Sequence, residues 1–217
     1  MPVSPDIATA ISTGNLDLLR GLLPSGSDLN KATLESGQSL LLIALYQGQR
    51  PVAEYLLSLG PSLSIFEAAA FGKVFEIQQN LAANPSLLDA YATDGWTPLH
   101  LAAFFGQPEA TRTLVEAGAS LSLVARNPMA NTPLHAAIAG GSREIAEQLL
   151  RAGANPSAIA AGGYTPVFLA ASRGDRQLVE RLLALGVSAS QKASDGQTPA
   201  EIASQRGHSE VALLLSQ

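Results

Sequence analysis

The feature that most restricts the fold of this 217-residue chain is a Thr-Pro pair that returns at nearly constant spacing. The pairs begin 35, 33 and 33 residues apart, at Thr97, Thr132, Thr165 and Thr198. A period of this length marks a repeated supersecondary unit, because one such unit cannot bury its apolar face alone and needs stacked neighbours. The sequence therefore predicts a stack of similar units, each in contact mainly with the units beside it.

The best-formed copy of the unit runs from residue 94 to residue 121 and predicts two short helices. Pro98 follows a turn and stands near the first position of a helix, where its missing N–H costs nothing. Gly106 ends this helix. A second helix is expected over residues 108–117, with Gly118 as a left-handed residue just past its end.

A four-residue signature connects these repeats to a known family. Thr-Pro-Leu-His stands at residues 97–100 and again at 132–135. Together with the period, this signature resembles the ankyrin-repeat family, in which each unit is a β-turn followed by two antiparallel helices. The resemblance covers nearly the whole chain and implies an all-α ankyrin-repeat solenoid of helix-turn-helix units with short β-hairpin fingers. We expect a single domain of about seven units, including both caps, over residues 4–33, 34–63, 64–90 (shortened), 91–123, 124–156, 157–189 and 190–217.

Two units depart from the regular length. Ser39 stands where the best-formed copy has Thr97, and the 58 residues between them leave one intervening unit about eight residues short. The missing part is the finger with its Thr-Pro pair, which predicts a notch in the row of fingers beside Trp96. The fifth unit has two extra residues instead, so its segment 127–131 is expected to form a longer finger.

Composition narrows the class of protein. Hydrophobic residues make up 47% of the chain and charged residues 14%, which favours a continuous core over disorder. There is no run of about 18 apolar residues, and the first residues lack the basic and apolar regions of a signal peptide. The chain has no cysteine, so it has no disulfide framework or thiolate zinc site. We expect a cytoplasmic monomer without a membrane partner, and the Ala-, Leu- and Gly-rich, lysine-poor repeats favour a bacterial source.

The charge pattern argues against a nucleic-acid partner. The net charge is −5, and the arginines of the repeats alternate with glutamates along the sequence. Proteins that bind nucleic acid through the phosphate backbone gather Lys and Arg in one patch or stripe. No such stripe is predicted here.

The residues that could carry chemistry are better explained as scaffold. His100 and His135 lie in the Thr-Pro-Leu-His signature, and the family resemblance implies that they hydrogen-bond to the turn and neighbouring backbone together with Thr97 and Thr132. His208, at the start of a helix, is also interpreted as structural. A zinc site needs three or four converging ligands, and no pair of histidines at ligand spacing is present. There is also no phosphate-binding Gly-rich loop and no Gly-x-Ser-x-Gly turn. We therefore expect no enzyme activity, no metal and no cofactor.

The resemblance implies a concave partner-binding groove, lined by the fingers and by the last residues of each first helix. At these positions the chain carries several of its few aromatic residues and two arginines, and the predicted partner-binding residues are Tyr46, Phe71, Trp96, Phe104, Phe105, Tyr164, Arg173 and Arg206. Aromatic residues and Arg dominate the energy of protein interfaces. Trp96 is expected to face solvent. For Phe71 and Phe104, packing between adjacent repeats is the alternative interpretation.

The function predicted from these features is non-catalytic recognition of a partner protein in the concave groove, as an interaction module or scaffold. The alternatives are a dedicated regulator or inhibitor of one enzyme, and a secreted effector. The residues do not identify the partner, because one fold serves many unrelated functions.

Overall fold

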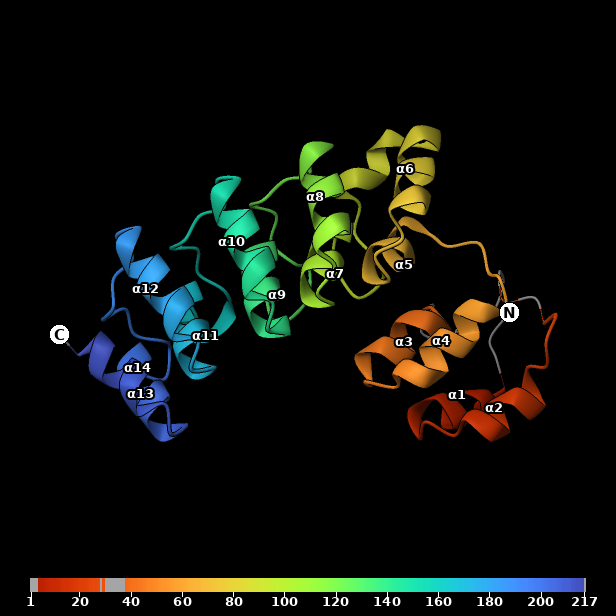
Figure 1. The fold of residues 1–217 in the computed structure, drawn as a ribbon, viewed down its shortest axis with the longest axis horizontal. Coiled ribbons are helices and arrows are strands. Elements are labelled where there is room, and N and C mark those ends of the chain that lie inside the picture. The colour runs from red at the N-terminus through yellow and green to blue at the C-terminus, as the bar shows by residue number, and fades with distance from the viewer. Residues whose placement is uncertain (1–3, 28, 30–37, 217) are drawn as a thin grey trace. The chain divides into compact units, whose positions relative to one another are not determined.

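The computed structural model describes residues 4–27, 29 and 38–216, and this part of the chain contains fourteen α-helices, two 3-10 helices and no strand (Figure 1). No helix in the described part is both long enough and apolar enough to cross a membrane. The chain falls into two compact units, Met1–Glu67 and Ala68–Gln217. The single domain expected over the whole chain therefore stays a prediction, and the two units are described separately.

The first unit is built from two helix pairs. Its helices are α1 (Pro5–Ser12), α2 (Leu16–Leu22), α3 (Leu40–Tyr46) and α4 (Arg50–Ser58). Helix α1 packs on α3 and α2 packs on α4, and the side chains of Ile11, Leu19 and Leu56 are fully buried between them. The boundary expected between residues 33 and 34 lies outside the described residues.

The second unit repeats the same helix pair. Its elements are α6 (Val74–Ala83), η1 (Pro85–Asp89), α7 (Pro98–Phe104), α8 (Pro108–Glu116), α9 (Pro133–Gly140), α10 (Arg143–Arg151), η2 (Ala161–Gly163), α11 (Pro166–Ser172), α12 (Arg176–Ala184), α13 (Pro199–Gln205) and α14 (Ser209–Leu215). Helix α5 (Ile65–Ala70) spans the boundary between the two units. The first helices α7, α9, α11 and α13 pack side by side in chain order, and the second helices α6, α8 and α10 form a parallel row (Figure 1).

Each regular unit starts its first helix in the same way. Thr97 is the N-cap of α7, Pro98 stands in the first turn, and the threonine side chain accepts the His100 backbone N–H. Thr132 and Thr198 form equivalent capping boxes. Because these caps satisfy N–H groups that the helix itself cannot pair, the Thr-Pro pair fixes where each first helix begins. The predicted helices of the best-formed copy are confirmed as α7 and α8.

Small residues set the distance between the first helices. Two consecutive alanines in each of α7, α9 and α11 are fully buried. The closest approach is at Gly140, where an added Cβ would lie 2.0 Å from the backbone oxygen of Phe104. Only a residue without a side chain fits there, so Gly140 allows the ends of α7 and α9 to touch.

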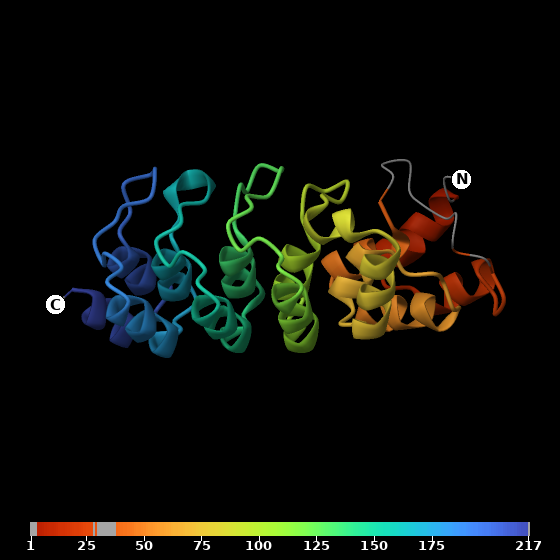
Figure 2. The same ribbon diagram turned by 90° about the horizontal axis from the view of Figure 1, so that it is seen from above.

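In the second compact unit, fingers precede the first helices α7, α9, α11 and α13 (Figure 2). Backbone hydrogen bonds close each of them, such as that from Ala92 N to Trp96 O at 2.8 Å and that from Ala125 N to Asn131 O at 2.8 Å. Neighbouring fingers are joined as well, for example by Arg126 N to Gly95 O at 2.8 Å. The expected fingers are present, although their pairing is too short to be assigned as strands in the described residues.

The connections that lead into the first helices differ in length. Only residues 59–64 connect α4 to α5, whereas residues 117–132 connect α8 to α9, so the third unit is shortened at its entry. At the start of α5, the Ser64 hydroxyl oxygen accepts the Glu67 N–H at 3.4 Å, and Ser64 donates its own N–H and hydroxyl to the Glu67 carboxylate at 2.8 and 2.7 Å. The notch inferred from this shortening would lie between the two compact units and stays a prediction.

Replacing Gly140 with Ala tests the close approach of α7 and α9. The new methyl group collides with backbone that cannot move aside, and we expect the free energy of unfolding to fall by about 1–3 kcal/mol. Urea denaturation followed by circular dichroism measures the change. Gly21→Ala is the matched control, because nothing lies within 4 Å of an added Cβ at that helical position and a small gain in stability is expected. Equal effects of the two substitutions would contradict this account.

Candidate functional site

The two signature histidines connect one finger to the next. In the His100 ring, Nδ1 lies 2.8 Å from Thr97 Oγ1 and accepts the Thr97 backbone N–H, while Nε2 lies 3.0 Å from the carbonyl oxygen of Asn131. His135 repeats this arrangement with Thr132 and with the carbonyl oxygen of Tyr164, at 3.1 Å. A carbonyl can only accept, so Nε2 must carry the proton, and Nδ1 must be unprotonated because a backbone N–H can only donate. Both rings are neutral and both nitrogens of each ring are engaged.

Burial keeps these rings uncharged. It lowers the pKa of His100 and of His135 to about 4, although the hydrogen bonds to the carbonyl oxygens act in the opposite direction. Neither ring has a nitrogen available as a general base or as a metal ligand. His208, which stands at the N-cap of α14, lies over Gly174, where an added Cβ would meet its ring. No group of three or more His, Cys, Asp or Glu side chains that could hold a metal occurs in the described residues.

The side chain of Trp96 is buried, contrary to the prediction from the sequence. Its side chain is only 2% exposed, so the expectation that it faces solvent is wrong. The ring of Phe104 packs edge-on against the indole with 4.9 Å between ring centroids, and the Trp96 backbone N–H donates to Asp94 Oδ1 at 3.1 Å. Because the finger folds back over α7, the large apolar indole is covered by its own unit. Trp96 therefore supports the surface from below and its ring is not available to a partner.

Phe104 and Phe105 form the outer layer of this cluster. Their rings are half-buried and stand edge to face with 5.2 Å between centroids. The side chain of Gln107 donates to the carbonyl oxygens of Ala70 and Phe105, at 3.0 and 3.2 Å, so the ends of α5 and α7 lie side by side. This arrangement places half-buried Phe71, which follows Ala70, near the Phe105 end of α7. The remaining predicted tyrosine of a first helix, Tyr46, is 37% exposed and belongs to the first compact unit.

The two predicted arginines are the C-caps of α11 and α13 and are exposed. Arg173 donates from Nη1 to the carbonyl oxygen of Ala139 at 3.0 Å. Neither Arg173 nor Arg206 forms an ion pair within the described residues, whereas Arg143 on a second helix lies 2.7 Å from Asp175. Positive charge is therefore left uncompensated by ion pairs at the ends of the first helices.

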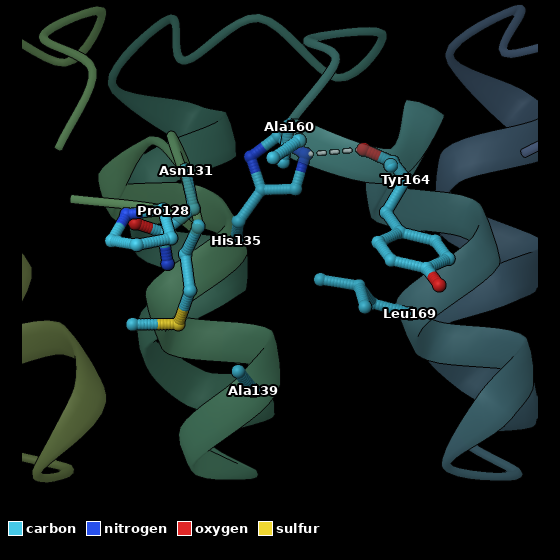
Figure 3. Close-up of a pocket in the computed structure, with 10 residues that line it drawn as sticks. Pro128, Asn131, His135, Ala139, Ala160, Tyr164 and Leu169 are labelled. Atoms are coloured by element: carbon cyan, nitrogen blue, oxygen red, sulfur yellow. Dashed lines mark hydrogen bonds between the residues drawn. The ribbon is translucent and has the colours of Figure 1, made fainter. Parts of the chain in front are cut away.

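A pocket that sequence reasoning missed lies between two fingers of the second compact unit (Figure 3). It has a volume of about 350 Å³ and is mostly apolar, and among the residues that line it are Pro128, Met129, Asn131, Ala139, Tyr164 and Leu169. Of the predicted residues it includes only Tyr164, which is 37% exposed. The sequence carried two signals for it, the longer finger at residues 127–131 and the pair Ala139-Gly140 in the place of two phenylalanines.

This row of paired helices, with fingers joined through buried histidines, defines a helical repeat protein. Family models described as "Ankyrin repeats (3 copies)" match residues 65–160 and 157–217, and a model described as "Ankyrin repeats (many copies)" matches residues 7–57. The chain belongs to the ankyrin-repeat family. Ankyrin repeats generally mediate protein–protein interactions, and no enzyme family is indicated. No curated protein matches the sequence.

The neutral histidines predict how stability depends on pH. In the unfolded chain the two rings bind a proton near pH 6.5, but in the folded chain only near pH 4. The unfolded state therefore binds more protons between these values, and the free energy of unfolding falls as pH drops from 6.5 towards 4. For each histidine the slope is about half of 1.4 kcal/mol per pH unit at pH 6.5 and rises towards about 1.4 kcal/mol per pH unit as the pH approaches 5. Urea denaturation between about pH 7 and pH 5 measures it, before most carboxylates titrate.

The variant His135→Gln separates this effect from general acid sensitivity. One of the two titrating rings is removed, so the slope over the same pH range should fall to about half, even though the variant is less stable at every pH. An unchanged slope would show that other groups cause the loss of stability.

Proposed function

We propose that the chain is a non-catalytic interaction module that binds a partner protein on the finger side of its second compact unit. The finger side is the surface formed by the fingers and by the ends of the first helices α7, α9, α11 and α13. The observation that carries the proposal is the aromatic cluster of Trp96, Phe104 and Phe105. Its buried indole packs against the half-buried ring of Phe104, which in turn stands edge to face with the half-buried ring of Phe105 at the end of α7. Burying the rest of these rings against a partner would remove further apolar surface from water, at about 25 cal/mol per Å².

Rigidity supports the same proposal. The finger that precedes α7 is closed on itself and joined to the next finger, and the His100 ring anchors that next finger through Asn131. A surface that is already ordered loses little conformational entropy when it binds. The Thr and His side chains of the Thr-Pro-Leu-His signature are already hydrogen-bonded within the scaffold. Recognition is therefore left to the variable residues at the helix ends.

The proposed surface carries positive charge that no ion pair within the described residues neutralises. Arg173 and Arg206 stand at equivalent positions in neighbouring units, and both lack an ion pair within the described residues. An arginine forms strong paired hydrogen bonds with a carboxylate. A partner with acidic residues beside apolar ones suits this surface best. A cytoplasmic monomer with no nucleic-acid or membrane partner remains part of this proposal.

A double variant tests the placement of the surface. Phe105→Ala/Arg206→Ala removes one ring and one charge from the finger side. The matched control Phe75→Ala/Arg112→Ala removes the same residue types from exposed positions on the second helices. A partner is first captured from a lysate of the source organism and then produced pure, and its dissociation constant is measured for each variant.

We expect the finger-side variant to bind at least about 30-fold more weakly, which corresponds to a hot spot of about 2 kcal/mol, and the control to bind normally. Circular dichroism and thermal unfolding verify that both variants are folded. Trp96→Ala is avoided, since its buried ring supports the fold. Loss of binding in the control alone would move the surface to the second helices and refute the proposal.

A further inference from the structure

The pocket between the fingers of the fifth and sixth units has a specific local cause. Ala139 and Gly140 stand at the positions that Phe104 and Phe105 occupy in the fourth unit, 35 residues earlier in the sequence. In the fourth unit Phe104 fills this space and packs against Trp96. In the fifth unit the small side chain of Ala139 leaves it open, and Asn131 stands in the place of Trp96.

The longer finger forms one wall of the pocket and is held on both sides. Asn127 donates from its side chain to the carbonyl oxygen of Asp94 at 3.1 Å, in the finger before it. Met129 accepts the Ala161 N–H at 3.0 Å, from the finger after it. Ala130 adopts a φ of 43°, which makes it the one non-glycine residue with positive φ in the described part of the chain. The two extra residues are therefore fixed in place, and the pocket exists before any ligand binds.

The lining of the pocket suits an aromatic side chain. Met129 and Tyr164 line it from neighbouring fingers and are 51% and 37% exposed. A thioether and an aromatic ring both make favourable contacts with an incoming ring. In the fourth unit, the positions equivalent to Asn131 and Ala139 carry the aromatic pair Trp96 and Phe104. This pair shows that aromatic rings have the shape and chemistry to fill the space.

One polar group in the lining lacks a partner. The side-chain oxygen of Asn131 is buried and has no hydrogen bond to any described residue, although the residue is only 6% exposed. Both ring nitrogens of His135, which also lines the pocket, are already engaged. The terminal torsion of an asparagine is soft, so the amide can turn its oxygen towards an incoming donor. The indole of tryptophan combines a large apolar body with a single N–H donor.

A positive charge lies at the edge of the same pocket. The Arg173 guanidinium is held on the carbonyl oxygen of Ala139, and the Ala139 side chain lines the pocket. Within the described residues no carboxylate pairs with this arginine. A ligand whose aromatic ring entered the pocket would therefore gain from a carboxylate next to that ring.

We propose that this pocket receives an aromatic side chain, best an indole, from a partner protein, and that an Asp or Glu beside this residue pairs with Arg173. The fingers before α7 and α13 flank the two fingers that form the pocket (Figure 2), so we expect the anchor residue to lie within a segment that runs along this row. The proposal rests on the proposed function as a protein-binding module. It adds the position of one anchor and the chemistry of the segment that the anchor belongs to.

Met129 gives a direct readout of this pocket. It is one of two methionines in the chain, so labelling the methionine methyl groups with ¹³C yields a spectrum of two signals. The probe is the hexapeptide Gly-Ser-Trp-Glu-Ser-Gly with both ends blocked, so that the Glu side chain is its only carboxylate. We expect a saturable shift of the Met129 signal. The peptide with Ser for Trp should bind at least about tenfold more weakly, and the peptide with Lys for Glu about two- to fivefold more weakly.

Two variants show whether the shift reports occupation of the pocket. Ala139→Phe places in the fifth unit the ring that Phe104 provides in the fourth, and it should abolish the shift by filling the pocket. Gln205→Phe adds the same ring at the equivalent exposed position of the last unit and should leave the shift unchanged. In Arg173→Gln the advantage of Glu over Lys in the peptide should disappear while the Trp dependence remains.

The contrary outcomes are equally clear. Absence of a Met129 shift with the Trp-Glu peptide, or an equal shift with the Ser-Glu peptide, would overturn the proposal. A shift that persists in Ala139→Phe would place the contact outside the pocket and would also overturn it. The proposed function is tested separately by Phe105 and Arg206, which do not line the pocket, so the module could still bind a partner on the finger side if this anchor failed.

Discussion

The hydrogen bond from a buried imidazole to the carbonyl oxygen of the next finger is the interaction that joins the fourth unit to the fifth and the fifth to the sixth. It requires the Nε2–H tautomer, and the threonine that caps the helix fixes that tautomer from the other side of the ring. One side chain therefore sets the start of a helix, the position of the following finger and the neutral charge of the core. Losing it would leave a buried carbonyl oxygen unsatisfied and would cost free energy in two units together.

Sequence reasoning was accurate where a local residue pattern decides the structure. The Thr-Pro pairs located the first helices, and Gly106 located the end of α7, because caps and breakers act over a few residues. It was wrong about Trp96, since the position before the cap gives no sign that Phe104, on the following helix, covers the indole. The pocket was also missed. Its walls come from two units, and a missing side chain such as Ala139 becomes informative only when its equivalent in the neighbouring unit is seen beside it.

Two positions at the end of each first helix vary along the second compact unit. These are Phe104-Phe105, Ala139-Gly140, Ser172-Arg173 and Gln205-Arg206 in successive units. The first pair forms an aromatic surface, the second opens a pocket, and the last two pairs present an exposed arginine. The scaffold is thus nearly constant while its binding surface changes from unit to unit. This division explains why the family alone cannot name the partner.

The anchoring histidine is absent from the last two units, where Phe168 and Glu201 stand in its place. A phenylalanine ring has no atom that can donate to the next finger, and Glu201 turns back to cap its own helix through Thr198. The finger before α13 is joined to its predecessor by the backbone bond from Ser194 to Gly162, without an imidazole bridge. Because each unit contacts only its neighbours, losing the imidazole bridge in the last two units makes the connections between units weaker at the C-terminal end of the row. Transient opening would begin at the C-terminal units and move towards the pocket, whose sixth-unit wall is the first part of the site to loosen.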